Sequence, residues 1–288
     1  MNEYVICADS SCDFSLEDLK SRELPCSSLT FRFNDSEKEF TNSEMSIEEF
    51  YQKMRDGGIA KTAAANSESF ITEFEEILKK GCDILYLGFS SGLSTTYNSA
   101  RIAAEQLRSE YPDRKIITVD TLAASAGIAL LIDLVIEKKN SGATIEEAAQ
   151  FAEETKLNIG HWFTVDDLVY LKRGGRVSAT TAFVGNMLGI KPVLHVDNDG
   201  HLINVGKVRG RKTSIAALAD KYGELAVDTA NGKVYISHGD CIKDAEELAK
   251  IIETKYGAKT ELITNVGPVI GAHSGPGTLA LFFVSKER

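Results

Sequence analysis

Apolar residues along this chain of 288 residues follow two patterns, short continuous runs and longer stretches with helical period. The runs CDILYLGF and RKIITVDT are typical of strands whose two faces are both covered. Between them, TTYNSARIAAEQLRSEY repeats its apolar positions as an amphipathic helix does. This order of strand, helix and strand predicts a βαβ unit and therefore a parallel sheet.

The rest of the first half extends this pattern. We expect a first strand in YVICADSS and two short strands in LTFRFN and KEFT. Capping residues and helical periodicity predict further helices over 15–20, 46–55, 67–80, 122–140 and 144–156.

The pattern changes after about residue 158. Thr164 and Asp167 are expected to open a helix over 164–173, and KPVLHVDNDGHLINVGKV is typical of a hairpin, which implies antiparallel pairing. Alternating helices and strands follow, then a glycine-rich loop, VGPVIGAHSGPG, and a last strand. We predict an α/β protein of two domains: a Rossmann-like parallel-sheet domain over 1–158 and a mixed-sheet domain over 159–288.

Composition excludes several classes of protein. The formal net charge of −10 argues against a dedicated nucleic-acid binder. The start of the chain lacks the pattern of a signal peptide, and the run GIALLIDLVI is too short to span a membrane. Five cysteines without a CxxC pair fit reduced thiols, so we expect a cytoplasmic protein. Asp9 and Asp13 could bind a metal, but both are ordinary turn residues and we predict no metal site.

A hydroxyl-rich stretch, GFSSGLSTTYNSA over 88–100, joins an expected strand to an expected helix. It matches the G-x-S-x-G pattern of a nucleophile elbow, which makes a serine hydrolase using Ser90 one hypothesis. The cap candidates Ser94 and Thr95 come several residues too late for a strained elbow. The stretch is then better read as an anion site at a helix N-terminus or as a simple helix cap, and a lipase or thioesterase that uses Ser90 stays the alternative.

Two further segments carry candidate groups. Thr62 lies among small residues just before a helix, and His273 and Ser274 lie in the loop stiffened by glycines and prolines. Arg173 and Arg176 belong to a basic cluster, LKRGGR, and KVRGRK forms a second cluster. Such clusters suit a phosphate-bearing ligand or an acidic partner, so a small-molecule phosphate binder also remains open.

These segments, in this order along the chain, resemble the DegV family of bacterial fatty-acid-binding proteins. The matching motifs are ADSSCDFS, the Thr62 segment, GFSSGLSTTYNSA, LKRGGRVS, KVRGRK, SHGD and GPVIGAHSGPG. The resemblance implies two α/β domains with a long-chain fatty acid between them. One departure is visible: family members commonly read T-S-x-P-S where this chain has TAAAN over 62–66.

The resemblance also implies the residues that hold the ligand. The carboxylate would be bound by Thr62, Ser94 and His273, with Thr95 and Ser274 as neighbouring contacts. Such a protein has no catalysis and no cofactor of its own. It presents the acid to a separate ATP-dependent kinase, which forms the acyl phosphate. Arg173 and Arg176 are expected to contact this partner or the phosphate.

Overall fold

The computed structural model describes residues 3–177 and 189–288. Its N-terminal part contains a four-stranded sheet in the order β2-β1-β6-β7, with parallel pairing throughout. The strands are β1 Tyr4–Asp9, β2 Cys26–Ser27, β6 Asp83–Gly88 and β7 Ile116–Asp120. Every residue of β6 is buried, as its continuous apolar run predicts. The predicted parallel sheet is confirmed.

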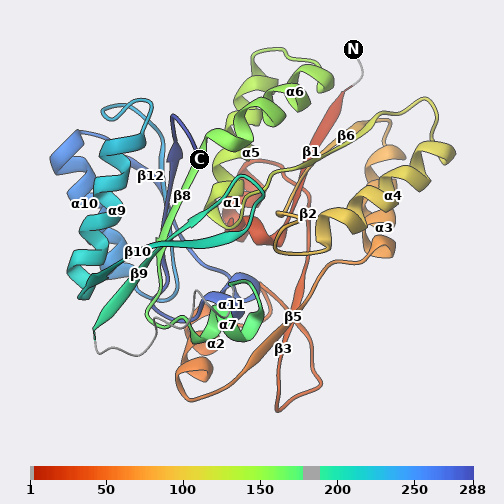
Figure 1. Ribbon diagram of the computed structural model, residues 1–288. Coiled ribbons are helices and arrows are strands. Elements are labelled where there is room, and N and C mark those ends of the chain that lie inside the picture. The colour runs from red at the N-terminus through yellow and green to blue at the C-terminus, as the bar shows by residue number, and fades with distance from the viewer. Residues whose placement is uncertain (1–2, 178–188) are drawn as a thin grey trace.

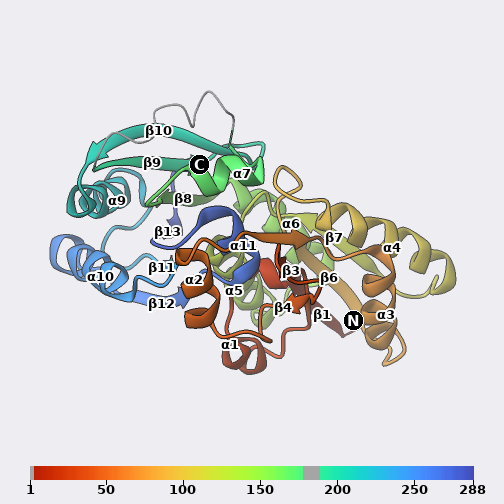
Figure 2. The same cartoon turned by 90° about the horizontal axis from the view of Figure 1, so that it is seen from below.

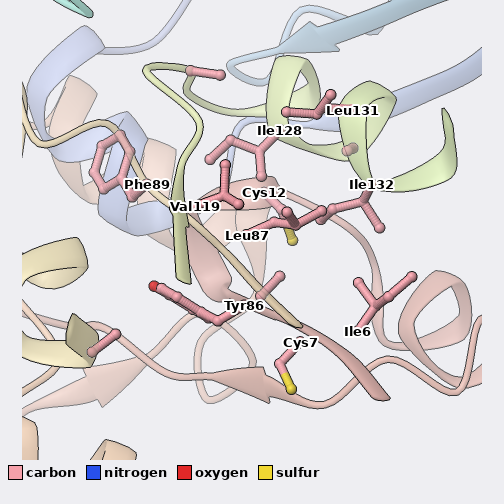
Figure 3. Close-up of a cluster of buried hydrophobic side chains, with 14 of the residues drawn as sticks. Ile6, Cys7, Cys12, Tyr86, Leu87, Phe89, Val119, Ile128, Leu131 and Ile132 are labelled. Carbon is pink, nitrogen blue, oxygen red and sulfur yellow. The ribbon is translucent and has the colours of Figure 1, made fainter. Parts of the chain in front are cut away.

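Two pairs of helices cover the two faces of this sheet (Figure 1). On one face lie α3 Ser67–Leu78 and α4 Thr96–Glu110, and on the other lie α5 Ala126–Asn140 and α6 Ile145–Thr155. Figure 3 shows the core where α5 meets the sheet. Its side chains come from three strands and one helix: Ile6, Leu87, Val119, Ile128, Leu131 and Ile132. Tyr86 points to the opposite face of the sheet, where it packs against Phe70 and Phe74 of α3.

The C-terminal part contains a six-stranded sheet in the order β10-β9-β8-β13-β11-β12. All neighbours pair antiparallel except β11 and β12, which are parallel, so the predicted mixed sheet is confirmed. The strands are β8 Ile159–Thr164, β9 Ile190–Val196, β10 Leu202–Arg209, β11 Val234–His238, β12 Thr260–Asn265 and β13 Leu279–Val284. The helices α9 Arg211–Leu225 and α10 Ile242–Tyr256 pack against this sheet.

Helix α5 lies between the two sheets, because it packs against β6 and also against β8, β11 and β13. A helix covered on both sides needs apolar residues around most of its circumference. The run from Ala126 to Ile132 is accordingly buried at every position. Among the described helices, none has the length and apolar character needed to cross a membrane.

A smaller antiparallel sheet, in the order β4-β3-β5, lies below both larger sheets in Figure 1. Its strands are β3 Thr30–Phe33, β4 Phe40–Thr41 and β5 Ala60–Ala63. Three short helices lie beside this sheet: α2 Ile47–Arg55, α7 Val169–Gly174 and α11 Pro268–Ser274. The remaining short elements are helix α1 Leu16–Ser21 and the 3-10 turns η1 Ser10–Cys12 and η2 Lys156–Asn158. Viewed from below, α11 lies in the middle of the molecule (Figure 2).

Three expectations for individual elements are wrong. The chain from 159 to 164 is strand β8, so Thr164 ends a strand and the next helix begins only at Val169, whose N–H bonds to Asp167 Oδ1 at 2.8 Å. Helix α5 begins at Ala126 and not at Leu122, because Leu122 and Ser125 both have positive φ.

The third wrong expectation is the glycine-rich loop, which contains the two-turn helix α11 with Pro268 at its first position.

The division into domains at residue 158 stays a prediction. Strand β8 begins at Ile159, directly after the predicted boundary.

Candidate functional site

A cavity of about 560 Å³ lies where the three sheets approach one another. Ligand sites typically have volumes of ~300 to 1,000 Å³, so this one is large enough for a small molecule. Its wall is mostly apolar, and the larger apolar side chains come from both halves of the chain: Phe89, Phe163, Val196, Leu202, Val269 and Phe282. The cavity therefore favours a ligand with a long apolar part.

Two predicted site residues meet directly at this cavity. Thr62 lies on β5, His273 lies in the last turn of α11, and the Thr62 hydroxyl is 2.8 Å from His273 Nε2. His273 Nδ1 is buried without a hydrogen-bond partner in the described part of the chain, and so is the neighbouring Ser274 hydroxyl. Gly174 of α7 lies against Nδ1, since a Cβ at Gly174 would overlap that nitrogen. Thr62 and His273 are therefore placed together at the cavity, and the Gly174 backbone covers His273 Nδ1.

The imidazole of His273 is neutral at ordinary pH. Burial, together with the positive charge of Arg176, lowers the pKa of His273 to about 4. A neutral imidazole donates through one nitrogen and accepts through the other. The site can therefore hold a polar head group by hydrogen bonds without first carrying a full positive charge on the ring.

The hydroxyl-rich loop supplies another side of the same cavity. Ser91, Gly92, Leu93, Ser94 and Thr95 all line it. The half-buried Ser94 hydroxyl lies 2.9 Å from Thr96 Oγ1 and accepts the N–H of Thr96 at 3.2 Å. Although Thr95 is the N-cap residue of α4, its side chain makes no capping bond.

Ser90 has a structural part in this loop. It is fully buried, its hydroxyl donates to the carbonyl of Gly200 at 2.9 Å, and its oxygen accepts the N–H of Gly92. Gly200 lies in the hairpin turn with φ of 76°, and a Cβ there would overlap the Ser90 hydroxyl. Because its proton is used by a carbonyl oxygen, Ser90 lacks the arrangement of an activated nucleophile.

The two predicted arginines lie in different places. Arg176 is half-buried, lines the cavity, and donates to the carbonyl oxygens of Leu93 and Gly174. Arg173 is exposed and lies over the ring of Tyr170, with 5.7 Å between its guanidinium carbon and the ring centroid. The structure therefore brings Arg176 to the other site residues and leaves Arg173 on the outer surface.

The carboxylates considered for a metal are engaged in hydrogen bonds. Asp9 accepts from Ser11, Tyr86 and Phe89. Asp13 accepts from the Ser125 hydroxyl and from the N–H of Gly267. Both carboxylates therefore contribute to the packing of the loops around the cavity.

The polar residues that line the cavity and that the sequence analysis missed include Ser125, His161, Ser237 and Thr278. His161 lies on the unexpected strand β8, and Ser237 lies on β11. The only available signal was local, a histidine or serine inside an apolar strand, and such a residue is more often simply buried than bound to a ligand.

The fold and this cavity define an α/β protein with a ligand cavity between its sheets. The family described as "Uncharacterised protein, DegV family" matches residues 3–286. The chain belongs to the DegV family, which confirms the resemblance seen in its motifs.

Similar proteins cover nearly the whole chain. The sequence is 42% identical to the DegV domain-containing protein CPE0026 of Clostridium perfringens, over 100% of this chain and 99% of that protein. It is 34% identical to a protein of Thermotoga maritima named fatty acid-binding protein, over 98% of each. The crystal structure of a DegV lipid-binding protein from Thermotoga maritima matches with a TM-score of 0.86 and 31% identity, over 99% of both chains.

Proposed function

We propose that this protein binds a long-chain fatty acid, with the carboxylate at Thr62, Ser94 and His273 and the tail along the apolar wall. The observation that carries this proposal is the hydrogen-bonded pair of Thr62 and His273 at the side of a mostly apolar cavity of about 560 Å³. A fatty acid combines the two properties that such a cavity requires, a compact polar head and a long apolar chain.

Further polar residues around this pair complete the proposed head-group site. Ser274, Thr95 and Arg176 all line the same cavity. The name of the Thermotoga maritima relative, fatty acid-binding protein, supports the same ligand class.

We further propose that the protein acts as a binding subunit without its own catalysis, in the cytoplasm, and presents the acid to a separate ATP-dependent kinase. The exposed Lys172 and Arg173 follow the cavity-lining Leu171 in α7, where an acidic partner surface could dock. Phosphorylation of the carboxylate would add negative charge beside Arg176 and favour a protonated His273.

The test of fatty-acid binding starts with native mass spectrometry of the full chain purified from cells, followed by titration of delipidated protein with stearic acid. We expect a co-purified acyl chain and binding of the added acid. The methyl ester of stearic acid has the same tail but no carboxylate, so it should bind much more weakly.

The variant Thr62→Val removes one hydroxyl with little change of shape. A hydrogen bond to a charged group contributes about 1.5 to 3 kcal/mol, so stearic acid should bind at least tenfold more weakly. The matched control is Thr72→Val, because Thr72 is exposed on α3 and should leave binding unchanged. Absence of any co-purified lipid, together with no binding of added acid, would contradict the proposal.

A further inference from the structure

Ser90 lies directly before the part of the hydroxyl-rich loop that forms the cavity wall. Residues 91–95 all line the cavity, and Ser90 is fully buried behind them. The carbonyl oxygen of Ser90 accepts the N–H of Leu93 at 3.0 Å and the N–H of Ser94 at 3.1 Å. The position of Ser94 in the proposed head-group site therefore depends on where Ser90 is held.

The other polar groups of Ser90 connect this loop to two more segments. Its N–H donates to the carbonyl oxygen of Ala123, just before α5, at 3.0 Å. Its hydroxyl donates to the carbonyl oxygen of Gly200 at 2.9 Å, and Oγ accepts the N–H of Gly92 at 3.2 Å. The direction of each bond is fixed, because a carbonyl oxygen only accepts and a backbone N–H only donates. Ser90 thus joins three segments of the chain.

The hairpin turn that contains Gly200 packs closely on the hydroxyl-rich loop. A Cβ at Gly92 would overlap the carbonyl oxygen of Gly200, and a Cβ at Gly200 would overlap the Ser90 hydroxyl. The two strands of this hairpin contribute Val196 and Leu202 to the apolar wall of the cavity. The Ser90 hydroxyl therefore ties a loop of the N-terminal part to a hairpin of the C-terminal part, at the edge of the cavity.

We propose that Ser90 is a positioning residue for the fatty-acid carboxylate: its hydrogen bond to the hairpin turn holds the loop so that Ser94 meets the acid. The inference rests on the proposed binding of the carboxylate by Ser94. Without the Ser90 hydroxyl, the carbonyl of the buried Gly200 loses its partner, and an unpaired buried polar group opposes folding. The loop and the turn should then separate to let water reach this group, which moves Ser94 away from the acid.

The test is a double-mutant cycle on the binding of stearic acid to the delipidated full chain. Ser94→Ala should weaken binding about tenfold, as the loss of one hydrogen bond to a charged group would give. Ser90→Ala should weaken binding about fivefold or more, although Ser90 does not touch the ligand. In the Ser94→Ala background the same change should cost less than about twofold, because Ser90 acts through Ser94.

The matched control is Ser214→Ala. Ser214 is also a fully buried serine, and its hydroxyl donates to the carbonyl oxygen of Arg211 at 2.7 Å. It lies on α9, which contributes no residue to the cavity wall in the described part of the chain. The control removes a comparable hydrogen bond, so it should lower stability and leave the affinity for stearic acid unchanged.

A second variant approaches the same hydrogen bond from the turn. Gly200→Ala places a methyl group against the Ser90 hydroxyl, at a position whose φ of 76° alanine adopts at a modest cost. It should weaken binding of stearic acid and show the same coupling to Ser94→Ala. This variant carries the test if Ser90→Ala does not fold.

The possible failures can be told apart. If Ser90→Ala leaves the affinity unchanged, or costs as much without the Ser94 hydroxyl as with it, Ser90 does not position Ser94. If stearic acid binds wild type and Ser94→Ala equally well, the inference is wrong while fatty-acid binding stands. If wild type binds no fatty acid at all, the proposed function itself is wrong.

Discussion

Asp13 joins the two halves of the structure beside the cavity, and its protonation should control stability. The carboxylate is buried; it accepts hydrogen bonds from the Ser125 hydroxyl at 2.5 Å and from the N–H of Gly267 at 3.0 Å. Burial raises the pKa of Asp13 from its ordinary value of 3.8 to about 7, although these two hydrogen bonds oppose the rise.

The sign and size of the effect follow from this pKa. Between about pH 4 and pH 7 the folded protein keeps the proton of Asp13, whereas the unfolded chain has released it. The free energy of unfolding therefore falls as the pH rises through this window and levels off above pH 7. Each pKa unit corresponds to about 1.4 kcal/mol, so the contribution lost between pH 5 and pH 8 is about 3 kcal/mol.

The perturbation is Asp13→Asn, which removes the charge and nearly preserves the shape. Asparagine tolerates the left-handed backbone at this position, where φ is 57°. Its amide oxygen can accept from Gly267 and its amide nitrogen can donate to Ser125. The variant should therefore keep both contacts and lose the dependence of stability on this titration.

The assay is urea denaturation of delipidated wild type and variant at pH 5, 6, 7 and 8. Relative to wild type, Asp13→Asn should gain about 3 kcal/mol in the free energy of unfolding between pH 5 and pH 8. Other titrating groups cancel in this difference, and Asp35→Asn at an exposed position should follow the wild-type curve. Parallel curves for wild type and Asp13→Asn would refute the reasoning.

Three further outcomes are expected. Arg176→Gln should raise the pKa of His273 above about 4, because it removes the nearby positive charge; NMR titration of the ring measures this, and an unchanged pKa would contradict it. A fluorophosphonate probe should leave Ser90 unlabelled, since its hydroxyl is buried on Gly200; mass spectrometry of the peptides would detect any adduct. Shortening the acid by two carbons should weaken binding about tenfold or more, at about 0.8 kcal/mol for each buried CH₂, and calorimetry that shows equal affinities would refute burial of the tail.

Most of the fold could be predicted because the segments that are buried in it have a recognisable pattern of apolar residues. CDILYLGF is apolar at nearly every position because helices cover both faces of the sheet that contains it, and β6 is buried throughout. The hairpin of β9 and β10 was visible from its turn residues. The start of α5 was not, because Leu122 and Ser125 adopt positive φ under tertiary contacts that their residue types do not indicate.

The proposed head-group site was only partly visible from the sequence. Loops rich in hydroxyls and glycines indicated Thr62, Ser94 and His273 one at a time, since such loops commonly bind ligands. Their meeting depends on the antiparallel pairing of β5 with β3 and on the docking of α11 beside that small sheet. Thr62 and His273 are 211 residues apart, and local patterns carry no information about a contact at that separation. Family resemblance supplied what local chemistry could not.

His161 and Ser237, which both line the cavity, show a different limit of prediction from sequence. The run IGHWFT is buried at all six positions, so it lacks the alternation that marks a half-exposed strand, and its histidine has no distinctive neighbours. Only the pairing of β8 and β11 with the two sides of β13 places His161 and Ser237 on one face. The pairing of strands that are distant in the sequence therefore decides which side chains from β8 and β11 reach the same face of the sheet.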